Sequence, residues 1–270
     1  LPWRRFVLSW LGRRVTMGYL GNILALVPRY RGFDVIVAHG DSLLLPLLGR
    51  PVVRIMHGSA FEEARTATSV SRAVLQYGVY LQELLTAWWL PSTVGVSENT
   101  VRSNRFVRHV IPNGVDRSVF SPDESQRSAR PSVLFVGALG GRKRGAWLLE
   151  AFQREIRPRW RDAELHMVTA AGAPEPGVHY HTGISGQDLV RLYRSAWVYA
   201  SPSTYEGFGL PYLEALACGT PVVATPNPGS REVLDNGRYG RLEEDATFAG
   251  TIVELLGDPA ARSRMTTSGL

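Results

Sequence analysis

The chain has 270 residues, of which 44% are hydrophobic and 20% are charged, a composition typical of a globular protein with a sizeable core and, at this length, about two domains. No apolar run reaches the roughly 18 residues of a membrane-spanning helix, and the single cysteine, Cys218, excludes an internal disulfide framework and fits a reducing compartment. The net charge of +6 favours an anionic partner, either a phosphorylated small molecule or a membrane surface, whereas no run of basic and aromatic residues indicates nucleic acid.

The first 14 residues, LPWRRFVLSWLGRR, combine apolar and basic side chains. Their arginines lie mostly apart from a set of apolar side chains at helical spacing, so the pattern predicts an amphipathic helix. We expect this helix to pack on a sheet, with contact to a membrane surface as the alternative. The apolar set is Trp3, Phe6, Val7, Trp10 and Leu11.

Short apolar runs alternate with longer helical segments along the rest of the chain. In the first half, the expected strands are 33–40, 51–58, 92–97 and 109–114, with a helix over 73–89. After a polar stretch, the expected strands are 132–137, 163–169, 197–203 and 220–225, and the expected helices are about 145–157, 187–195, 211–218 and 246–257. This alternation indicates two Rossmann-like domains, residues 1–118 and 119–270, with function at the carboxyl ends of parallel strands.

Residues 205–223, YEGFGLPYLEALACGTPVV, hold two glutamates eight positions apart around a glycine-rich turn. Pro211 suits the first turn of a helix, and the glycines before it let the backbone approach a ligand closely. Free N–H groups at a helix N-terminus suit a phosphate. Glu206 precedes that terminus, and Glu214 lies one turn into the helix with a carboxylate suited to the vicinal hydroxyls of a ribose. Taken alone, this spacing also fits a surface helix with two solvated acids.

The longer string SPSTYEGFGLPYLEALACGTPVVAT resembles the signature of retaining glycosyltransferases of family 4, the glycosyl transferases group 1. VIPNGVDRSVFSP and VLFVGALGGRKRGAWLLEAF resemble the end of the family's N-terminal domain and the start of its C-terminal domain. The resemblance implies the GT-B architecture, an α/β fold in which two Rossmann-like domains with parallel sheets face each other across a cleft. It also implies an enzyme that transfers a hexosyl-type sugar from a nucleotide-diphosphate-sugar donor to an acceptor with retention of the anomeric configuration.

The resemblance also assigns roles to individual residues. It implies that Glu206 lies against the donor sugar and that Glu214 holds the ribose hydroxyls. His57, in RIMHG, is expected to face the donor sugar near the reacting carbon, and Gly137 to leave space for the diphosphate. The loop whose N–H groups meet the sugar and the diphosphate is matched by Gly207, Phe208, Gly209 and Leu210.

One basic loop departs from the family pattern. Where the family usually has an arginine directly after the glycine and a lysine six residues later, this chain has Ala138 and Arg144. We expect Arg142, Lys143 and Arg144 to bind the diphosphate together, although arginine and lysine differ in geometry; a solvated loop is the alternative. The catalytic candidates are then His57, Glu206, Lys143 and Arg144.

Departure of a nucleoside diphosphate builds negative charge on the leaving phosphate, which cations and N–H dipoles stabilise. No Asp-x-Asp sequence occurs in the chain, so we predict transfer without a metal ion and without a cofactor. The resemblance implies front-face attack rather than a covalent intermediate. The expected partners are a nucleotide sugar and a sugar, lipid-linked or small-molecule acceptor, in the cytoplasm, with peripheral contact to an anionic inner membrane face left open.

Several alternatives stay open. The family's opening strand and glycine-rich loop are not found before residues 33–40, and the sequence stops before the usual final helix. We therefore interpret the chain as a fragment that binds nucleotide and turns over poorly. A catalytically silent GT-B protein that binds nucleotide or a partner, favoured by Ala138, is the main alternative. A GT-B epimerase or phosphorylase is less consistent with the motif, because Lys143 lies in the wrong kind of loop to carry pyridoxal phosphate.

Overall fold

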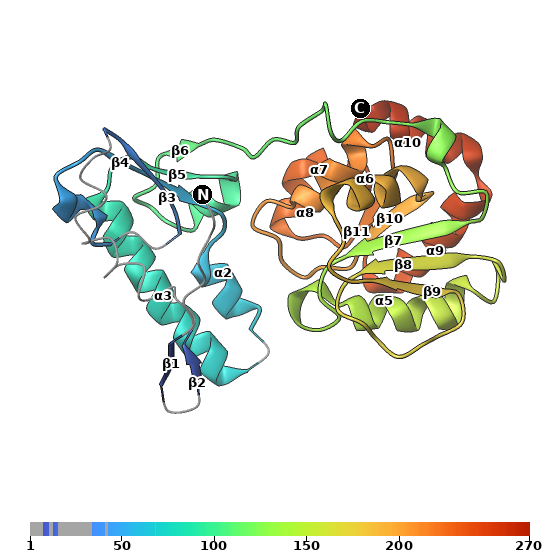
Figure 1. Cartoon of the computed structure of the whole chain (residues 1–270), viewed down its shortest axis with the longest axis horizontal. Coiled ribbons are helices and arrows are strands. Elements are labelled where there is room, and N and C mark those ends of the chain that lie inside the picture. Colours follow the sequence, from blue (N-terminus) through green and yellow to red (C-terminus); the bar gives the residue numbers. More distant parts are fainter. Residues whose placement is uncertain (1–7, 11–12, 16–33, 41–42, 68) are drawn as a thin grey trace. The chain divides into compact units, whose positions relative to one another are not determined.

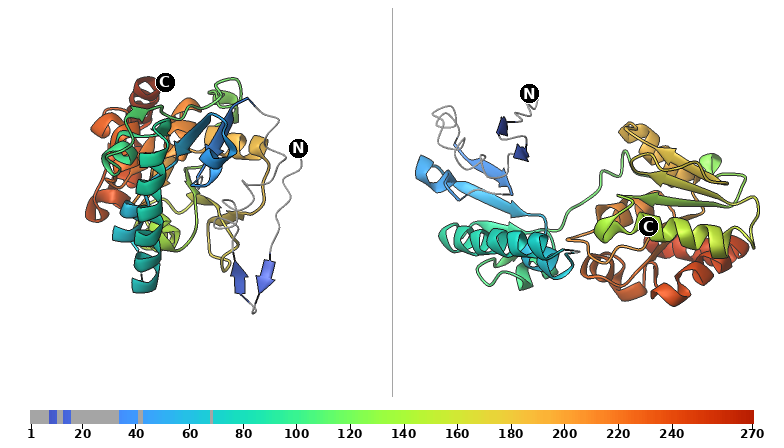
Figure 2. Two further views of the ribbon diagram at one scale, coloured as in Figure 1. Left: turned by 90° about the vertical axis from the view of Figure 1, so that its left-hand side faces the viewer. Right: turned by 90° about the horizontal axis from the view of Figure 1, so that it is seen from below.

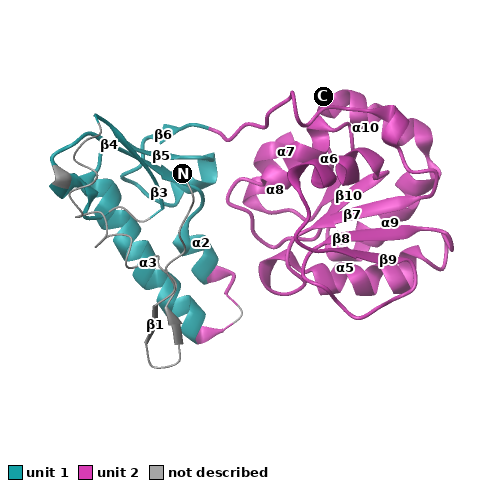
Figure 3. Ribbon diagram, viewed as in Figure 1, with its two compact units in different colours: residues 1–64, 71–111 teal, residues 65–70, 112–270 magenta. Residues whose placement is uncertain are grey.

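A computed structural model describes residues 8–10, 13–15, 34–40, 43–67 and 69–270. The chain divides into two compact units (Figure 3), the first formed by residues 1–64 and 71–111 and the second by residues 65–70 and 112–270. Each unit has its own parallel sheet. The domain boundary near residue 118 stays a prediction.

The first unit contains a four-stranded parallel sheet in the order β3-β4-β5-β6. The strands that the apolar runs predict are confirmed, and each lies within its expected range. They are β3 (Ile36–His39), β4 (Val52–Met56), β5 (Thr93–Gly95) and β6 (His109–Val110). The helical elements are η2 (Leu45–Leu48), α2 (Ala60–Arg65), α3 (Val70–Trp89) and α4 (Glu98–Arg102).

The helix predicted over the first 14 residues is wrong where this part of the chain is described. β1 (Leu8–Trp10) and β2 (Arg13–Val15) pair antiparallel, with Leu8 opposite Val15 and Trp10 opposite Arg13. Tryptophan and valine favour a pleated strand as much as a helix face, and strand pairing satisfies the backbone groups without any helical spacing. The other members of the predicted apolar face, Trp3, Phe6, Val7 and Leu11, lie outside the described residues.

The second unit is a six-stranded parallel sheet in the order β12-β11-β10-β7-β8-β9 (Figure 1). Its strands are β7 (Ser132–Val136), β8 (Glu164–Val168), β9 (Val178–His181), β10 (Val198–Ser201), β11 (Val222–Ala224) and β12 (Arg241–Leu242). The sequence predicts four of them; β9 and β12 were missed. The chain leaves the middle of the sheet in two directions, β7 to β9 on one side and β10 to β12 on the other. The strand order therefore reverses between β7 and β10.

Helices cover both faces of this sheet, as Figures 1 and 2 show. Val133 and Phe135 of β7 face a core shared with α5 and α9, whereas Leu134 between them faces a core shared with α6 and α7. This alternation buries the strand on both sides, which is typical of parallel sheets. The helices are α5 (Gly145–Ala151) with a π-helical turn (Phe152–Ile156), α6 (Gly186–Ser195), α7 (Leu210–Ala217), α8 (Pro228–Val233), α9 (Asp245–Gly257) and α10 (Pro259–Gly269).

Three histidines form a stack on the edge strand β9 and its neighbour β8. The ring of His166 lies 4.9 Å from that of His179 and 5.3 Å from that of His181. Its Nε2 is 3.5 Å from a carboxylate oxygen of Glu164. Burial, together with the charges of the two other histidines, outweighs the attraction of Glu164 and lowers the pKa of His166 to about 4. The His166 ring is therefore neutral in the folded protein near pH 7.

We expect the free energy of unfolding to fall as the pH decreases from 6.5 towards 4, by about 2 kcal/mol from this site, because the unfolded chain binds a proton that folded His166 excludes. The contribution is fully present above pH 6.5. Chemical denaturation at pH 7, 6, 5 and 4.5 would measure it against His166→Gln, which lacks the titrating ring. Equal pH slopes in wild type and variant would contradict this expectation.

Candidate functional site

The two loops at the reversal point of the second sheet are joined to each other. The loop after β7 includes residues 137–144, and the loop after β10 includes residues 202–209. The backbone N–H of Thr204 donates to the carbonyl oxygen of Arg142 at 2.9 Å, and Nη1 of Arg142 donates to the carbonyl oxygen of Tyr205 at 2.7 Å. In open α/β sheets, ligands bind in the crevice beside such a point, at the carboxyl ends of the strands.

Glu206 forms a buried charge cluster with two cations from the other loop. Its residue surface is only 5% exposed; Oε2 lies 2.8 Å from Nη1 of Arg142 and Oε1 lies 2.6 Å from Nζ of Lys143. Burial alone would raise the pKa of Glu206, but the charges and hydrogen bonds of Lys143 and Arg142 outweigh it and hold that pKa below its usual value. The acid is therefore a carboxylate near neutral pH, held by both loops.

The glycine-rich turn leads directly into the N-terminus of α7 (Leu210–Ala217). Gly209 adopts φ +103°, and a Cβ there would overlap the ring of Tyr212, so glycine is needed at this position. α7 begins at Leu210 with proline in its first turn, and its N-cap residue, Gly209, has no side chain that could cap the helix. The helix dipole at this terminus favours a negative group beside it.

A buried polar network around Asn227 holds the glycine-rich turn in place. The sequence analysis did not predict this network. The side chain of Asn227 donates to the carbonyl oxygen of Ser203 at 2.9 Å and to the hydroxyl of Tyr212 at 3.2 Å. Asn227 also caps α8 through Ser230. In that first turn, a Cβ on Gly229 would lie 2.5 Å from the Phe208 carbonyl oxygen. The α8 terminus therefore packs at backbone contact against residues 206–209, the acidic turn.

Glu214 is oriented by a helix that the motif does not include. Its Oε2 accepts a hydrogen bond of 2.8 Å from the hydroxyl of Tyr193 in α6. Burial raises the pKa of Glu214, and this effect exceeds the opposing effects of the Tyr193 hydrogen bond and the Lys143 charge. The charge of Lys143 therefore acts on both acids of the motif. Among the described residues, Oε1 of Glu214 makes no hydrogen bond of its own, which leaves this atom for a ligand hydroxyl.

Arg144, expected with the other cations, has different partners. Its Nη1 and Nη2 lie 2.9 Å and 2.5 Å from the two carboxylate oxygens of Asp245, and its guanidinium carbon lies 4.6 Å from the centre of the Trp147 ring. Gly137 is in close contact with the basic loop, because a Cβ there would lie 3.1 Å from Cγ and Cδ of Lys143. In the structure, Gly137 and Lys143 are therefore in contact, whereas the side chain of Arg144 pairs with α9.

His57 lies in the first unit, at the end of β4. Its Nε2 is 2.8 Å from Nδ1 of His39 at the end of β3, and the two rings stack at 5.1 Å. Burial and the neighbouring His39 lower the pKa of His57. Sequence reasoning missed His39, whose signal is its position at the carboxyl end of the adjacent predicted strand.

The described residues were compared with the requirements of a metal site and of a membrane-spanning helix. Within them, no group of three or more histidine, cysteine, aspartate or glutamate residues is arranged to hold a metal ion. Among the helices of the described part, none has the length and hydrophobicity to cross a bilayer.

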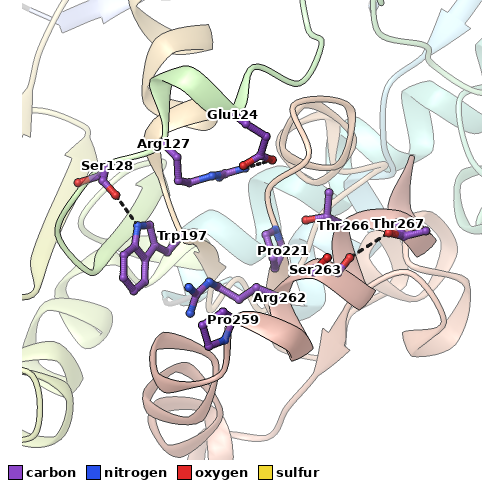
Figure 4. A pocket seen from close by; sticks show the side chains of 10 residues that line it. All are labelled: Glu124, Arg127, Ser128, Trp197, Pro221, Pro259, Arg262, Ser263, Thr266 and Thr267. Carbon is purple, nitrogen blue, oxygen red and sulfur yellow. Dashed lines mark hydrogen bonds and ion pairs between the residues drawn. The ribbon is translucent and has the colours of Figure 1, made fainter.

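A pocket of about 330 Å³ lies at the opposite ends of the strands of the second sheet (Figure 4). Trp197 and Pro221 in its wall precede β10 and β11, so it opens at the amino ends of the strands. Arg262 stacks over the Trp197 ring at 4.2 Å and donates to the carbonyl oxygens of Leu255 and Leu256. This pocket is therefore separate from the acidic turn.

An arrangement of this kind, with glycines, cations and a helix N-terminus at the reversal of a parallel sheet, is typical of nucleotide-binding α/β proteins. Residues 130–258 match the family model described as glycosyl transferases group 1. The matched residues include the basic loop and both glutamates of the acidic motif, and the matched family is the one that the sequence resembles.

Individual relatives agree with this family match. The D-inositol 3-phosphate glycosyltransferase of Arthrobacter sp. is 33% identical over 184 residues, which cover 58% of this chain and 43% of that protein. The sucrose-phosphate synthase of Thermosynechococcus elongatus has a TM-score of 0.77 at 21% identity, covering 97% of this chain and 76% of that one. Anabaena HepE in complex with UDP-glucose has a TM-score of 0.70 at 18% identity, covering 97% and 78%. The predicted GT-B fold, with parallel α/β sheets, is confirmed.

The chain spans about half or less of the curated relatives it matches, for example 36% of the probable sucrose-phosphate synthase of Thermosipho melanesiensis and 54% of a mannosyltransferase of Mycolicibacterium hassiacum.

We expect Gly229→Ala to displace the acidic turn, because the new methyl group would lie 2.5 Å from the Phe208 carbonyl oxygen and 2.8 Å from Cβ of Glu206. The free energy of unfolding should fall by about 1–3 kcal/mol, as for other overpacked sites. Denaturant titration would measure it beside Gly250→Ala, whose Cβ meets nothing within 4 Å on α9 and which should be neutral or slightly stabilising. Equal stability of the two variants would show that the contact at Gly229 is not tight.

Proposed function

We propose that the second unit binds a nucleotide-diphosphate-sugar and that the complete protein transfers its hexosyl-type sugar to an acceptor with retention of configuration. One observation carries the proposal: Lys143 is held at a buried carboxylate beside the N-terminus of α7, whose N-cap residue is a glycine without a capping side chain. Cations and free N–H groups at one place suit a diphosphate, whose negative charge increases as it leaves the sugar. The match of residues 130–258 to the family model supports the same interpretation.

Different residues would bind different parts of the donor. The N–H groups of Gly209 and Leu210 and the side chains of Lys143 and Arg142 would meet the diphosphate. The carboxylate of Glu214, already oriented by Tyr193, would accept hydrogen bonds from the ribose hydroxyls. We assign Gly137, Gly207 and Phe208 to the close backbone approach that the family resemblance implies.

Glu206 is better suited to organise the site than to attack the sugar. A nucleophilic carboxylate must be free to approach the anomeric carbon, but this one is 5% exposed and paired with two cations. Its negative charge holds Lys143 and Arg142 in place before the diphosphate arrives, which reduces the reorganisation during reaction. This favours front-face attack without a covalent intermediate, with His57 retained as the candidate beside the reacting carbon.

We infer that two cations and the helix terminus neutralise the leaving diphosphate without a metal ion. The proposed acceptors are a sugar, a lipid-linked group or a small molecule. A cytoplasmic location with peripheral membrane contact stays part of the proposal and rests on the single cysteine and the net charge of +6. Because a solved structure with the same fold holds UDP-glucose, UDP is the first nucleotide to test.

A catalytically silent nucleotide-binding protein is the second candidate. Ala138 stands where the family usually has an arginine, which removes one cation from the diphosphate. Arg142 provides a guanidinium in the same loop, at 2.8 Å from Glu206. Binding of nucleotide without transfer by the full-length protein would select this second candidate.

We expect one of UDP, GDP, ADP and TDP to raise the melting temperature of the chain in the presence of EDTA. Glu214→Ala should weaken binding of that nucleotide at least tenfold, because the ribose loses its acceptor, and Lys143→Met should do so because the diphosphate loses a cation. Thermal-shift titrations provide the measurement. Glu150→Ala, which removes an exposed acid on α5, is the matched control.

Two outcomes would contradict the proposal. Binding that Glu214→Ala and Lys143→Met leave unchanged would place the nucleotide elsewhere. Binding or transfer that EDTA abolishes and Mg²⁺ restores would overturn metal independence.

A further inference from the structure

Arg144 holds its backbone in a conformation that L-residues rarely adopt. With φ 54° and ψ 34°, it lies in the left-handed region, which is strained for a non-glycine residue. At this position the chain turns from the short 3-10 helix η4 (Gly141–Lys143) into α5. Glycine would adopt the same turn without strain, so the arginine side chain must contribute something that offsets it.

The side chain of Arg144 fastens this turn to α9. Its guanidinium forms a bidentate ion pair with Asp245, the first residue of α9, at 2.9 Å and 2.5 Å. Bidentate pairs of this kind fix orientation as well as distance. Trp147 reinforces the same junction, because Arg144 lies over its ring and the ring packs edge-on against Phe248 of α9 at 5.5 Å. The turn is thus attached to a helix that contributes no residue to the Glu206 cluster.

Lys143 precedes this fastened residue directly, so the direction of its side chain depends on the turn. Three backbone hydrogen bonds close the turn: Arg144 N–H to Gly141, Gly145 N–H to Ala138 and Ala146 N–H to Leu139. While they hold, Lys143 reaches Glu206 and Arg144 reaches Asp245, in different directions from adjacent positions. Release of Arg144 would give Lys143 additional rotational freedom, which binding of a ligand must then remove.

We propose that Arg144 and Asp245 form a clamp that positions Lys143 for the diphosphate, and that Arg144 is a positioning residue that makes no contact with the donor. The inference rests on the proposed function of the site. It also explains why three consecutive cations occur in the loop: two face the acid, and the third fixes the turn that presents them.

The competing role, in which Arg144 leaves Asp245 to bind the diphosphate itself, predicts the opposite sign for one substitution. Asp245→Asn breaks the pair. If Arg144 were a direct ligand, its release would leave UDP binding unchanged or tighter. If the clamp positions Lys143, the same substitution weakens binding through the turn and not through a contact between Asp245 and the donor.

The dissociation constant for UDP, or for whichever of the four nucleotides wild type binds, should be measured by isothermal titration calorimetry. We expect Asp245→Asn and Arg144→Gly each to weaken binding about fivefold to tenfold, with the double variant no weaker than either single one. Asp245→Glu should retain most of the affinity. Glu150→Gln breaks a solvent-exposed ion pair on α5 and should change nothing. A tenfold loss in Arg144→Gly with no loss in Asp245→Asn would overturn the clamp.

A measurement without ligand separates this inference from the proposed function. Hydrogen exchange of the Arg144, Gly145 and Ala146 amides should accelerate in Asp245→Asn and not in Glu150→Gln. Unchanged exchange in Asp245→Asn would overturn the clamp even if nucleotide binds. Failure of wild type to bind any nucleotide would overturn the proposed function, and faster exchange in Asp245→Asn would still support the clamp.

Discussion

A carboxylate buried between two cations is the interaction on which the second unit's site depends. Glu206 is inaccessible enough that its charge would be strongly unfavourable without Arg142 and Lys143, because removal of one partner from a buried ion pair costs several kcal/mol. The ion pairs of Glu206 with Arg142 and Lys143 therefore hold the loops after β7 and β10 together. A site that carries its own anion keeps its cations in place when no ligand is bound, and a diphosphate then meets a preorganised surface.

The order of the strands in the sheet explains why these two loops meet. β7 and β10 are neighbours, and the chain continues from β7 to β8 on one side of the sheet and from β10 to β11 on the other. The connections that follow the two strands therefore diverge, which leaves room for a ligand between the two loops at the carboxyl ends of the strands. The helices then add specific partners: Tyr193 of α6 orients Glu214, Asn227 before α8 supports the turn, and Asp245 of α9 takes Arg144. The acidic motif itself contributes the two acids and the free helix terminus, and the surrounding elements fix their directions.

Much of this arrangement could be predicted from the sequence, for physical reasons. Apolar runs bounded by turn residues marked the buried strands, and Pro211 marked the start of α7. The edge strand β9 was missed because Val178–His181 is rich in polar rings and gives no apolar run. Charge alone could not separate Arg144 from Arg142 and Lys143, since a left-handed turn at residue 144 decides their directions. The His39–His57 contact was equally hidden, because it joins the ends of two strands whose pairing the sequence does not state.

The most direct test of the account is the pKa of the Glu206 carboxyl group, measured by NMR titration of the protein labelled with ¹³C at the glutamate carboxyl carbons and assigned with Glu206→Gln. We predict that Glu206 titrates below a solvent-exposed glutamate in wild type, and that its pKa rises in Lys143→Met, where burial is opposed by one cation instead of two. A Glu206 carboxyl group that titrates at the ordinary value, and does so equally in both proteins, would contradict the charge cluster on which the proposed donor site is built.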